Sequence, residues 1–347
     1  MEYQRKKYLD IAKGIGIILV VWAHANGPGS RYINLFHMPL FFFISGILFN
    51  ENDSCETFIV KKVKSLYIPF VLWNVLIYFI EYSARIALEG KTFNLDTYIS
   101  LVFQIEAGVN KASFLGATWF LAALFWITVF YKVIYTYLLN HTEHAEIVMF
   151  LLSTFMAIIA FKITFPYFIS RTIICSLFYS AGHLTSKLIP MLLAQKGKYW
   201  FSGLLFVIFI FINNSNYANM GQNQYNNSIC FVIGAFLGTV ALIIVSKGIE
   251  DFTEKLAQLL ECLGKNSITI VIWQFIAFIP VFLIQAVNDN IPLKDILLLL
   301  YQQHTYNTEA FGWIWYCITG IFIPVLVGML LKDTFINKVL KKLYMVR

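Results

Sequence analysis

Ten runs of apolar residues, each about 20 residues long, follow one another along most of this 347-residue chain. A helix needs roughly 20 apolar residues to cross a hydrocarbon core about 30 Å thick. We therefore predict an all-α, polytopic membrane protein with about ten transmembrane helices. The predicted spans lie near residues 8–27, 32–50, 66–88, 114–139, 146–163, 168–188, 199–213, 228–247, 266–286 and 311–331.

The composition supports this class and excludes others. Hydrophobic residues make up 59% of the chain and charged residues 13%, whereas a soluble domain has about 45–50% and about 25%. The net charge of +7 comes from basic residues scattered among apolar runs, without the basic stripe that nucleic-acid binding needs. We expect one integral-membrane domain over 1–347, no separate soluble domain and no nucleic-acid partner.

The basic residues also predict an orientation. Most of them fall in alternate connecting segments and near both ends of the chain. Because Lys and Arg concentrate in cytoplasmic loops, this bias predicts that both termini are cytoplasmic. The five cysteines show no paired spacing, so we expect neither a disulfide framework nor a metal site.

The first apolar run carries three ionisable residues, Asp10, Lys13 and His24. At about 100° per residue, Lys13 and His24 differ by about 20° around a helix, and Asp10 lies about 60° to one side. They would therefore form a polar stripe on one helix face, although Lys13 and His24 would be about 16 Å apart along the axis. Asp10 and Lys13 are spaced to form an ion pair.

Charged groups inside a membrane are costly, so they often mark functional sites. Asp10 and Lys13 could instead reach the inner interface with their charged ends, which would be a structural role. His24 has no cytoplasmic surface within reach, and we predict a functional role for it. In the second run, Pro39 can open the helix backbone, and His37 lies on the same outer side as His24; a structural interface role for His37 is an equal alternative.

The order DIAKGIGIILVVWAH, a short loop and FHMPLFFFISGILF resembles the start of the membrane-bound acyltransferase family 3. The family's opening motif is a basic residue, ten further residues and a histidine, which Lys13 and His24 match. Asp10 matches the acidic residue three positions earlier. Lys61 and Lys64 match a basic pair that precedes the third helix in the family.

Two further stretches, GATWFLAALF at 116–125 and LGKNSITIVIWQF at 263–275, resemble the branch of this family that O-acetylates sugars and polysaccharides. Many relatives have a histidine where Gln274 stands, which argues against a catalytic role at that position. The resemblance implies a multi-pass protein of the inner (cytoplasmic) cell membrane. It also implies acyl-CoA, most often acetyl-CoA, as donor substrate, and no tightly bound cofactor.

The expected reaction moves an acyl group from cytoplasmic acyl-CoA to a hydroxyl of a cell-surface glycan or of its lipid-linked precursor. A sugar hydroxyl needs a base near neutral pH, and imidazole suits that task. His24 is therefore the predicted general base or acyl carrier, with Lys13 and Asp10 beside it as catalytic candidates. Lys61 and Lys64 are candidates for binding the phosphates of the donor. The acceptor or oxyanion candidates are His37, Trp119 and Arg171.

Two other functions fit the same sequence. A transporter or flippase of a lipid-linked sugar or small polar solute also needs buried charge and a polar path, although no inverted repeat of hydropathy is visible. A non-catalytic scaffold for polysaccharide assembly is a third reading. Release of CoA thiol in the presence of a glycan acceptor would separate the enzyme from both.

Overall fold

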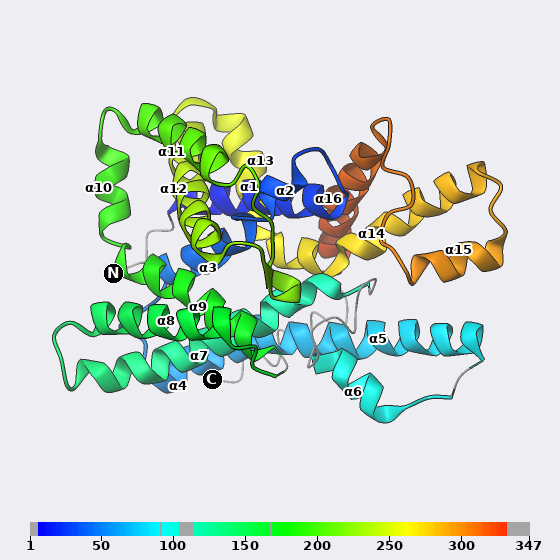
Figure 1. Ribbon diagram of the computed structural model, residues 1–347, viewed down its shortest axis with the longest axis horizontal. Coiled ribbons are helices and arrows are strands. Elements are labelled where there is room, and N and C mark those ends of the chain that lie inside the picture. Colours follow the sequence, from blue (N-terminus) through cyan, green and yellow to red (C-terminus); the bar gives the residue numbers. More distant parts are fainter. Residues whose placement is uncertain (1–5, 91, 104–113, 167, 332–347) are drawn as a thin grey trace.

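The computed structural model describes residues 6–90, 92–103, 114–166 and 168–331, and helices dominate it (Figure 1). The helices of its first half are α1 (Lys7–His24), α2 (Ser30–Ile33), α3 (His37–Ile47), α4 (Cys55–Lys62), α5 (Ile68–Glu89), α6 (Leu95–Phe103), α7 (Trp119–Leu139) and α8 (Ala145–Lys162). The second half contains α9 (Ile169–Leu184), α10 (Leu188–Ala194), α11 (Lys198–Ile212), α12 (Ser228–Phe252), α13 (Glu254–Lys265), α14 (Ser267–Asn288), α15 (Leu293–Leu300) and α16 (Gly312–Leu331). Shorter elements are a π-helical turn (Val63–Tyr67), two 3₁₀ turns (Gly116–Thr118 and Met220–Gln222), and the strands β1 (Ala218–Asn219) and β2 (Gln224–Tyr225).

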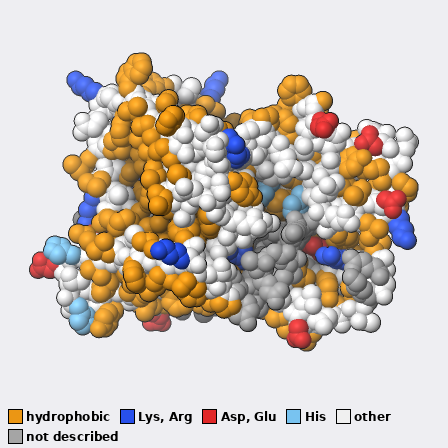
Figure 2. All heavy atoms as spheres, viewed as in Figure 1, with side chains coloured by type: hydrophobic (Ala, Val, Ile, Leu, Met, Phe, Trp, Pro, Cys, Tyr) orange, Lys and Arg blue, Asp and Glu red, His pale blue; other side chains and the backbone are white. Residues whose placement is uncertain are grey.

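Within these described residues, six helical stretches are long and apolar enough to cross a membrane: Cys55–Leu88, Gly116–Leu139, Ala145–Lys162, Ser228–Phe252, Ser267–Asn288 and Gly312–Leu330. Hydrophobic side chains also cover much of the face shown in Figure 2. The molecule is thus an all-α membrane protein, as expected. A helix lies in each of the ten predicted ranges, but ten spans remain a prediction. The predicted cytoplasmic termini lie outside the described residues.

The second predicted span, 32–50, differs from the structure. Its place is taken by α2 and the 11-residue α3, which begins at His37. At about 1.5 Å per residue α3 is far shorter than the hydrocarbon core. Pro39 lies in the first turn of α3, where a missing backbone N–H removes no helical hydrogen bond, so it does not kink the helix.

The helix α1 lies in the upper half of the molecule as drawn in Figure 1, in the same half as α12, α13 and α16. It packs against α3, α12, α13, α14 and α16. Gly14 of α1 and Gly264 of α13 make the closest of these contacts, because a Cβ at either position would collide with the backbone of the other helix. The sequence predicted only an inner loop where α13 lies.

A second close contact joins α3 to α9. A Cβ on Gly46 would collide with the carbonyl of Tyr179, and a Cβ on Gly182 would collide with the carbonyl of Phe43. Small residues allow this approach because membrane helices gain their association energy from backbone proximity and packing. The contact connects α3 to the bundle formed by α7, α8 and α9.

A buried lysine fixes the turn that follows α3. Lys132 of α7 is 2% exposed, and its Nζ donates to the carbonyl of Glu51 at 2.9 Å. The ammonium also lies 5.3 Å from the ring centroid of Phe49 and 5.6 Å from that of Phe58. Backbone carbonyls and aromatic faces together stabilise this cation away from water.

Candidate active site

A cavity of about 480 Å³ lies beyond the C-terminal end of α1. Four parts of the chain line it: Val20 to Asn26 at the end of α1, Asn34 to Met38 around the start of α3, the hairpin 217–221, and the segment 303–305. Ala117, Trp119 and Phe120 at the start of α7 and Val271 of α14 complete the lining. No Asp, Glu, Lys, Arg or Cys is among these lining residues of the described chain.

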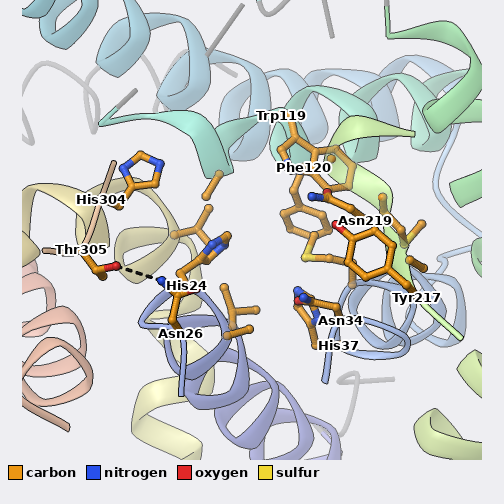
Figure 3. A pocket seen from close by; sticks show the side chains of 18 of the residues that line it. His24, Asn26, Asn34, His37, Trp119, Phe120, Tyr217, Asn219, His304 and Thr305 are labelled. Carbon is orange, nitrogen blue, oxygen red and sulfur yellow. Dashed lines mark hydrogen bonds between the residues drawn. The ribbon is translucent and has the colours of Figure 1, made fainter. Parts of the chain in front are cut away.

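His24 is the last residue of α1, and its side chain faces the cavity (Figure 3). The turn that follows is held from two sides. Nε1 of Trp22 donates to the carbonyl of Pro28 at 3.0 Å. Nδ2 of Asn26 donates to Oγ1 of Thr305 at 2.9 Å. Asn26 adopts a φ of 56°, a left-handed conformation that asparagine tolerates better than most residues.

His37 faces the same cavity from the first turn of α3 and is 6% exposed. Its Nδ1 lies 2.7 Å from the carbonyl oxygen of Ile33. A carbonyl only accepts hydrogen bonds, so Nδ1 carries the proton and Nε2 keeps a lone pair. The backbone therefore fixes both the tautomer and the orientation of this imidazole.

The polar loop NNSNYANMGQNQYNN contributes the hairpin that lines one wall. β1 and β2 pair antiparallel, with Ala218 opposite Tyr225. The side chain of Asn219 accepts from the backbone N–H of Gln222 at 3.2 Å and closes the turn. Asparagine side chains satisfy backbone groups in this way, which brings Tyr217 and Asn219 to the cavity (Figure 3). No function was predicted for this loop from the sequence.

Of the acceptor or oxyanion candidates, Trp119 lines the cavity, but Arg171 does not. Arg171 is 4% exposed and lies behind the tryptophan, with its guanidinium carbon 5.4 Å from the indole centroid. Its Nη1 donates to the carbonyl of Gly221 at 2.9 Å. Arg171 thus holds Trp119 and the hairpin in place, and its guanidinium is not in contact with the cavity.

His304 was given no role by the sequence, yet it lines the cavity. Its ring is stacked on Phe275 of α14, with centroids 3.8 Å apart and an angle of 11° between the planes. Phe275 also meets the ring of His24 edge-on at 4.8 Å. Burial lowers the pKa of His304 to about 4, so this imidazole is neutral near pH 7. No periodicity or spacing in the sequence places position 304 beside position 24.

Asp10 and Lys13 form the predicted ion pair, with Nζ of Lys13 2.6 Å from Oδ1 of Asp10. The predicted polar stripe from Lys13 to His24 is interrupted, however. Ile17 and Val20 occupy the same helix face between them and are 0% and 2% exposed. The cavity includes α1 residues only from Val20 onward, so it does not reach the ion pair.

The donor candidates Lys61 and Lys64 lie in α4 and in the π-helical turn that follows it. Nζ of Lys61 is 2.8 Å from Oδ1 of Asp53 on the surface. An incoming phosphate would therefore compete with this carboxylate for the ammonium. Gln274 is fully buried next to the cavity residue Val271 and donates to its carbonyl, and it does not line the cavity.

Away from the cavity, Glu51, Glu146 and His183 hold their potential ligand atoms within 4.8 Å of one another, close enough to surround a metal ion. These atoms already have partners. Nε2 of His183 is 2.9 Å from Oε1 of Glu51, and Lys187 lies 3.3 Å from Glu146. Partial burial raises the pKa of Glu51, but the hydrogen bonds from His183 and Tyr135 and the charges of His183 and Lys187 together outweigh burial and hold that pKa below its usual value. The cluster is an ion-paired network, and the absence of a metal stays a prediction.

The fold and the cavity define a helical membrane protein with a histidine-lined polar site within it. The family model described as "Acyltransferase domain" matches residues 6–333, and the chain belongs to this family, acyltransferase family 3. The protein is therefore a membrane acyltransferase. Comparison with curated proteins and with solved structures gave no match.

Proposed function

We propose that this acyltransferase moves an acetyl group from cytoplasmic acetyl-CoA to a hydroxyl of a cell-surface glycan or of its lipid-linked precursor. His24 acts as the general base or the acyl carrier. The protein works in the inner cell membrane. One observation carries this proposal: the imidazole of His24 faces a cavity of about 480 Å³ whose walls are aromatic rings, amides and further imidazoles.

That lining suits an uncharged, hydroxyl-rich acceptor. Trp119, Phe120 and Tyr217 offer flat apolar surfaces, while Asn34 and Asn219 offer amides that both donate and accept hydrogen bonds. Pockets of roughly 300–1,000 Å³ with a few convergent polar groups are typical of small-ligand sites. An imidazole at such a site can take the proton of a hydroxyl that attacks a thioester.

The donor would be bound by Lys61 and Lys64, which lie in α4 and in the π-helical turn that follows it, and by the Asp10–Lys13 pair in the first half of α1. Lysine ammonium groups bind phosphates as point charges, which suits the polyanionic part of CoA. Because no lysine lines the cavity in the described chain, only the reactive end of the donor would meet His24. The donor route between these groups and His24 is part of the proposal.

The test uses the full-length protein purified in detergent, acetyl-CoA, and surface glycan prepared from cells that lack the protein. The wild type should release CoA thiol in a glycan-dependent way and leave O-acetyl groups that NMR detects on the glycan. His24→Ala should lose both signals, whereas replacement of the exposed His141, on the 140–144 turn, should lose neither. Absence of thiol release, together with solute uptake into vesicles, would instead establish transport and refute the proposal.

A further inference from the structure

Three imidazoles of the described chain line the cavity. That of His304 is stacked on Phe275, and those of His24 and His37 differ in how they are held. Nδ1 of His37 is bound to the carbonyl of Ile33 at 2.7 Å. In contrast, the ring of His24 makes no hydrogen bond to any residue of the described chain and meets Phe275 edge-on. His37 is therefore oriented as an acceptor at Nε2, and His24 keeps a ring nitrogen that can react.

On the basis of the proposed function, we propose that the two imidazoles divide the reaction between them. His24 carries the acyl group as a covalent acyl-imidazole, and His37 is the catalytic base that takes the proton of the acceptor hydroxyl. His37 reaches the cavity beside Asn34, on the side where Tyr217 and Asn219 also lie (Figure 3). The amide and aromatic groups that would hold a sugar thus surround the base.

The size of the cavity favours a divided reaction. A volume of about 480 Å³ is that of a single drug-sized ligand, and it would not hold a sugar and the arm of CoA together. A covalent carrier lets the donor leave before the acceptor enters. Once His24 is acylated, its reactive nitrogen can no longer take a proton, so a second base is required. Because the lining has no carboxylate, amine or thiol within the described residues, an imidazole must supply that base.

Acyl transfer takes place in two steps. A ring nitrogen of His24 attacks the thioester carbonyl carbon, the C–S bond breaks, and CoA leaves as the thiol with the proton from the other ring nitrogen. The acceptor hydroxyl then attacks the acyl carbon while Nε2 of His37 takes the hydroxyl proton. The C–N bond to His24 breaks, and the proton passes from His37 to the departing imidazole. Both histidines return to their neutral forms.

The experiment separates the steps by rapid quenching of the full-length protein with radiolabelled acetyl-CoA and no acceptor. The wild type should release up to one thiol per protein and hold the label on His24, located by mass spectrometry. His37→Gln and His37→Ala should keep this burst, but glycan added afterwards should remove the label at least about 100-fold more slowly. Imidazole in the buffer should restore part of the rate to His37→Ala only. His24→Ala should show no burst, and His141→Gln should match the wild type.

Three results would overturn the inference. The first is that His37→Gln loses both the burst and the transfer to glycan. The second is that His37→Gln transfers the acetyl group at the wild-type rate. The third is that the wild type and the His37 variants acetylate glycan although the protein itself never carries the label. If His37→Ala does not fold, His37→Gln decides, because it retains a similar size and a hydrogen-bonding end. A wild-type protein that neither releases thiol nor acetylates glycan would refute the proposed function itself, which is a distinct outcome.

Discussion

The contact between α3 and α9 provides a quantitative test of the fold. Replacing Gly46 with alanine places a methyl group against the carbonyl of Tyr179, where the structure has no room for it. The obstacle is backbone, so the two helices must separate. Overpacking of this kind costs about 1–3 kcal/mol. Gly182→Ala should cost a similar amount, because its Cβ would meet the carbonyl of Phe43 in the same contact.

Cys175 of α9 supplies the assay, since its thiol is fully buried and becomes reactive only when the bundle opens. Unfolding in detergent would be followed with a thiol-reactive dye after the other four cysteines are changed to serine. The matched control is Gly203→Ala in α11, where an added Cβ meets nothing within 4 Å. Alanine favours a helix over glycine by up to about 1 kcal/mol, so this control should be neutral or stabilising.

The double variant Gly46→Ala/Gly182→Ala adds a sharper expectation. Once the methyl group of one variant has separated the two helices, the second methyl group meets less resistance. The double variant should therefore lose clearly less unfolding free energy than the sum of the losses in the two single variants. The reasoning would be refuted if Gly46→Ala unfolded like Gly203→Ala. Strict additivity of the two glycine variants would contradict the shared contact.

Three further predictions concern charged groups. Lys132→Ala should destabilise the protein by about 1–3 kcal/mol, seen in the same dye assay, because the carbonyl of Glu51 loses its buried donor. Lys13→Ala should destabilise more than Asp10→Ala, because removal of the ammonium leaves the buried Asp10 carboxylate without this counter-charge, whereas Lys13 is the more exposed partner of the pair and can turn towards solvent when Asp10 is removed. Burial lowers the pKa of His304 from 6.5 to about 4. As the pH falls, the imidazole of His304 is therefore protonated in the unfolded chain before it is protonated in the folded protein. Stability should therefore fall from pH 6.5 to about pH 4, by up to about 3 kcal/mol, and then level off; melting curves of His304→Gln should lack this component.

The sequence predicted the helical membrane class because hydrophobic runs of membrane length leave the backbone few alternatives. It also predicted the Asp10–Lys13 pair and the presence of His24 near a helix end, since these follow from spacing along one helix. The length of α3 could not be predicted in the same way. Tertiary contacts from Gly46 and Gly182 allow a short helix to be buried by protein, where hydropathy alone suggests a full span.

The composition of the cavity was less predictable. His304 and the hairpin residue Tyr217 reach His24 only through contacts between distant parts of the chain, and a single sequence does not encode such distances. The interruption of the polar stripe by Ile17 and Val20 shows a related limit. Helical periodicity gives the azimuth of a side chain, but the neighbouring helices decide whether the space beside it is open or filled.

The hydrogen bond between Asn26 and Thr305 joins residues that are 279 positions apart in the chain. During synthesis His24 is made near the beginning, whereas the wall that holds His304 emerges only after α15. A nascent chain that ends before this segment therefore lacks the wall of the cavity that Gln303, His304 and Thr305 form opposite the end of α1. A truncated chain of this kind would insert most of its helices without completing the cavity around His24.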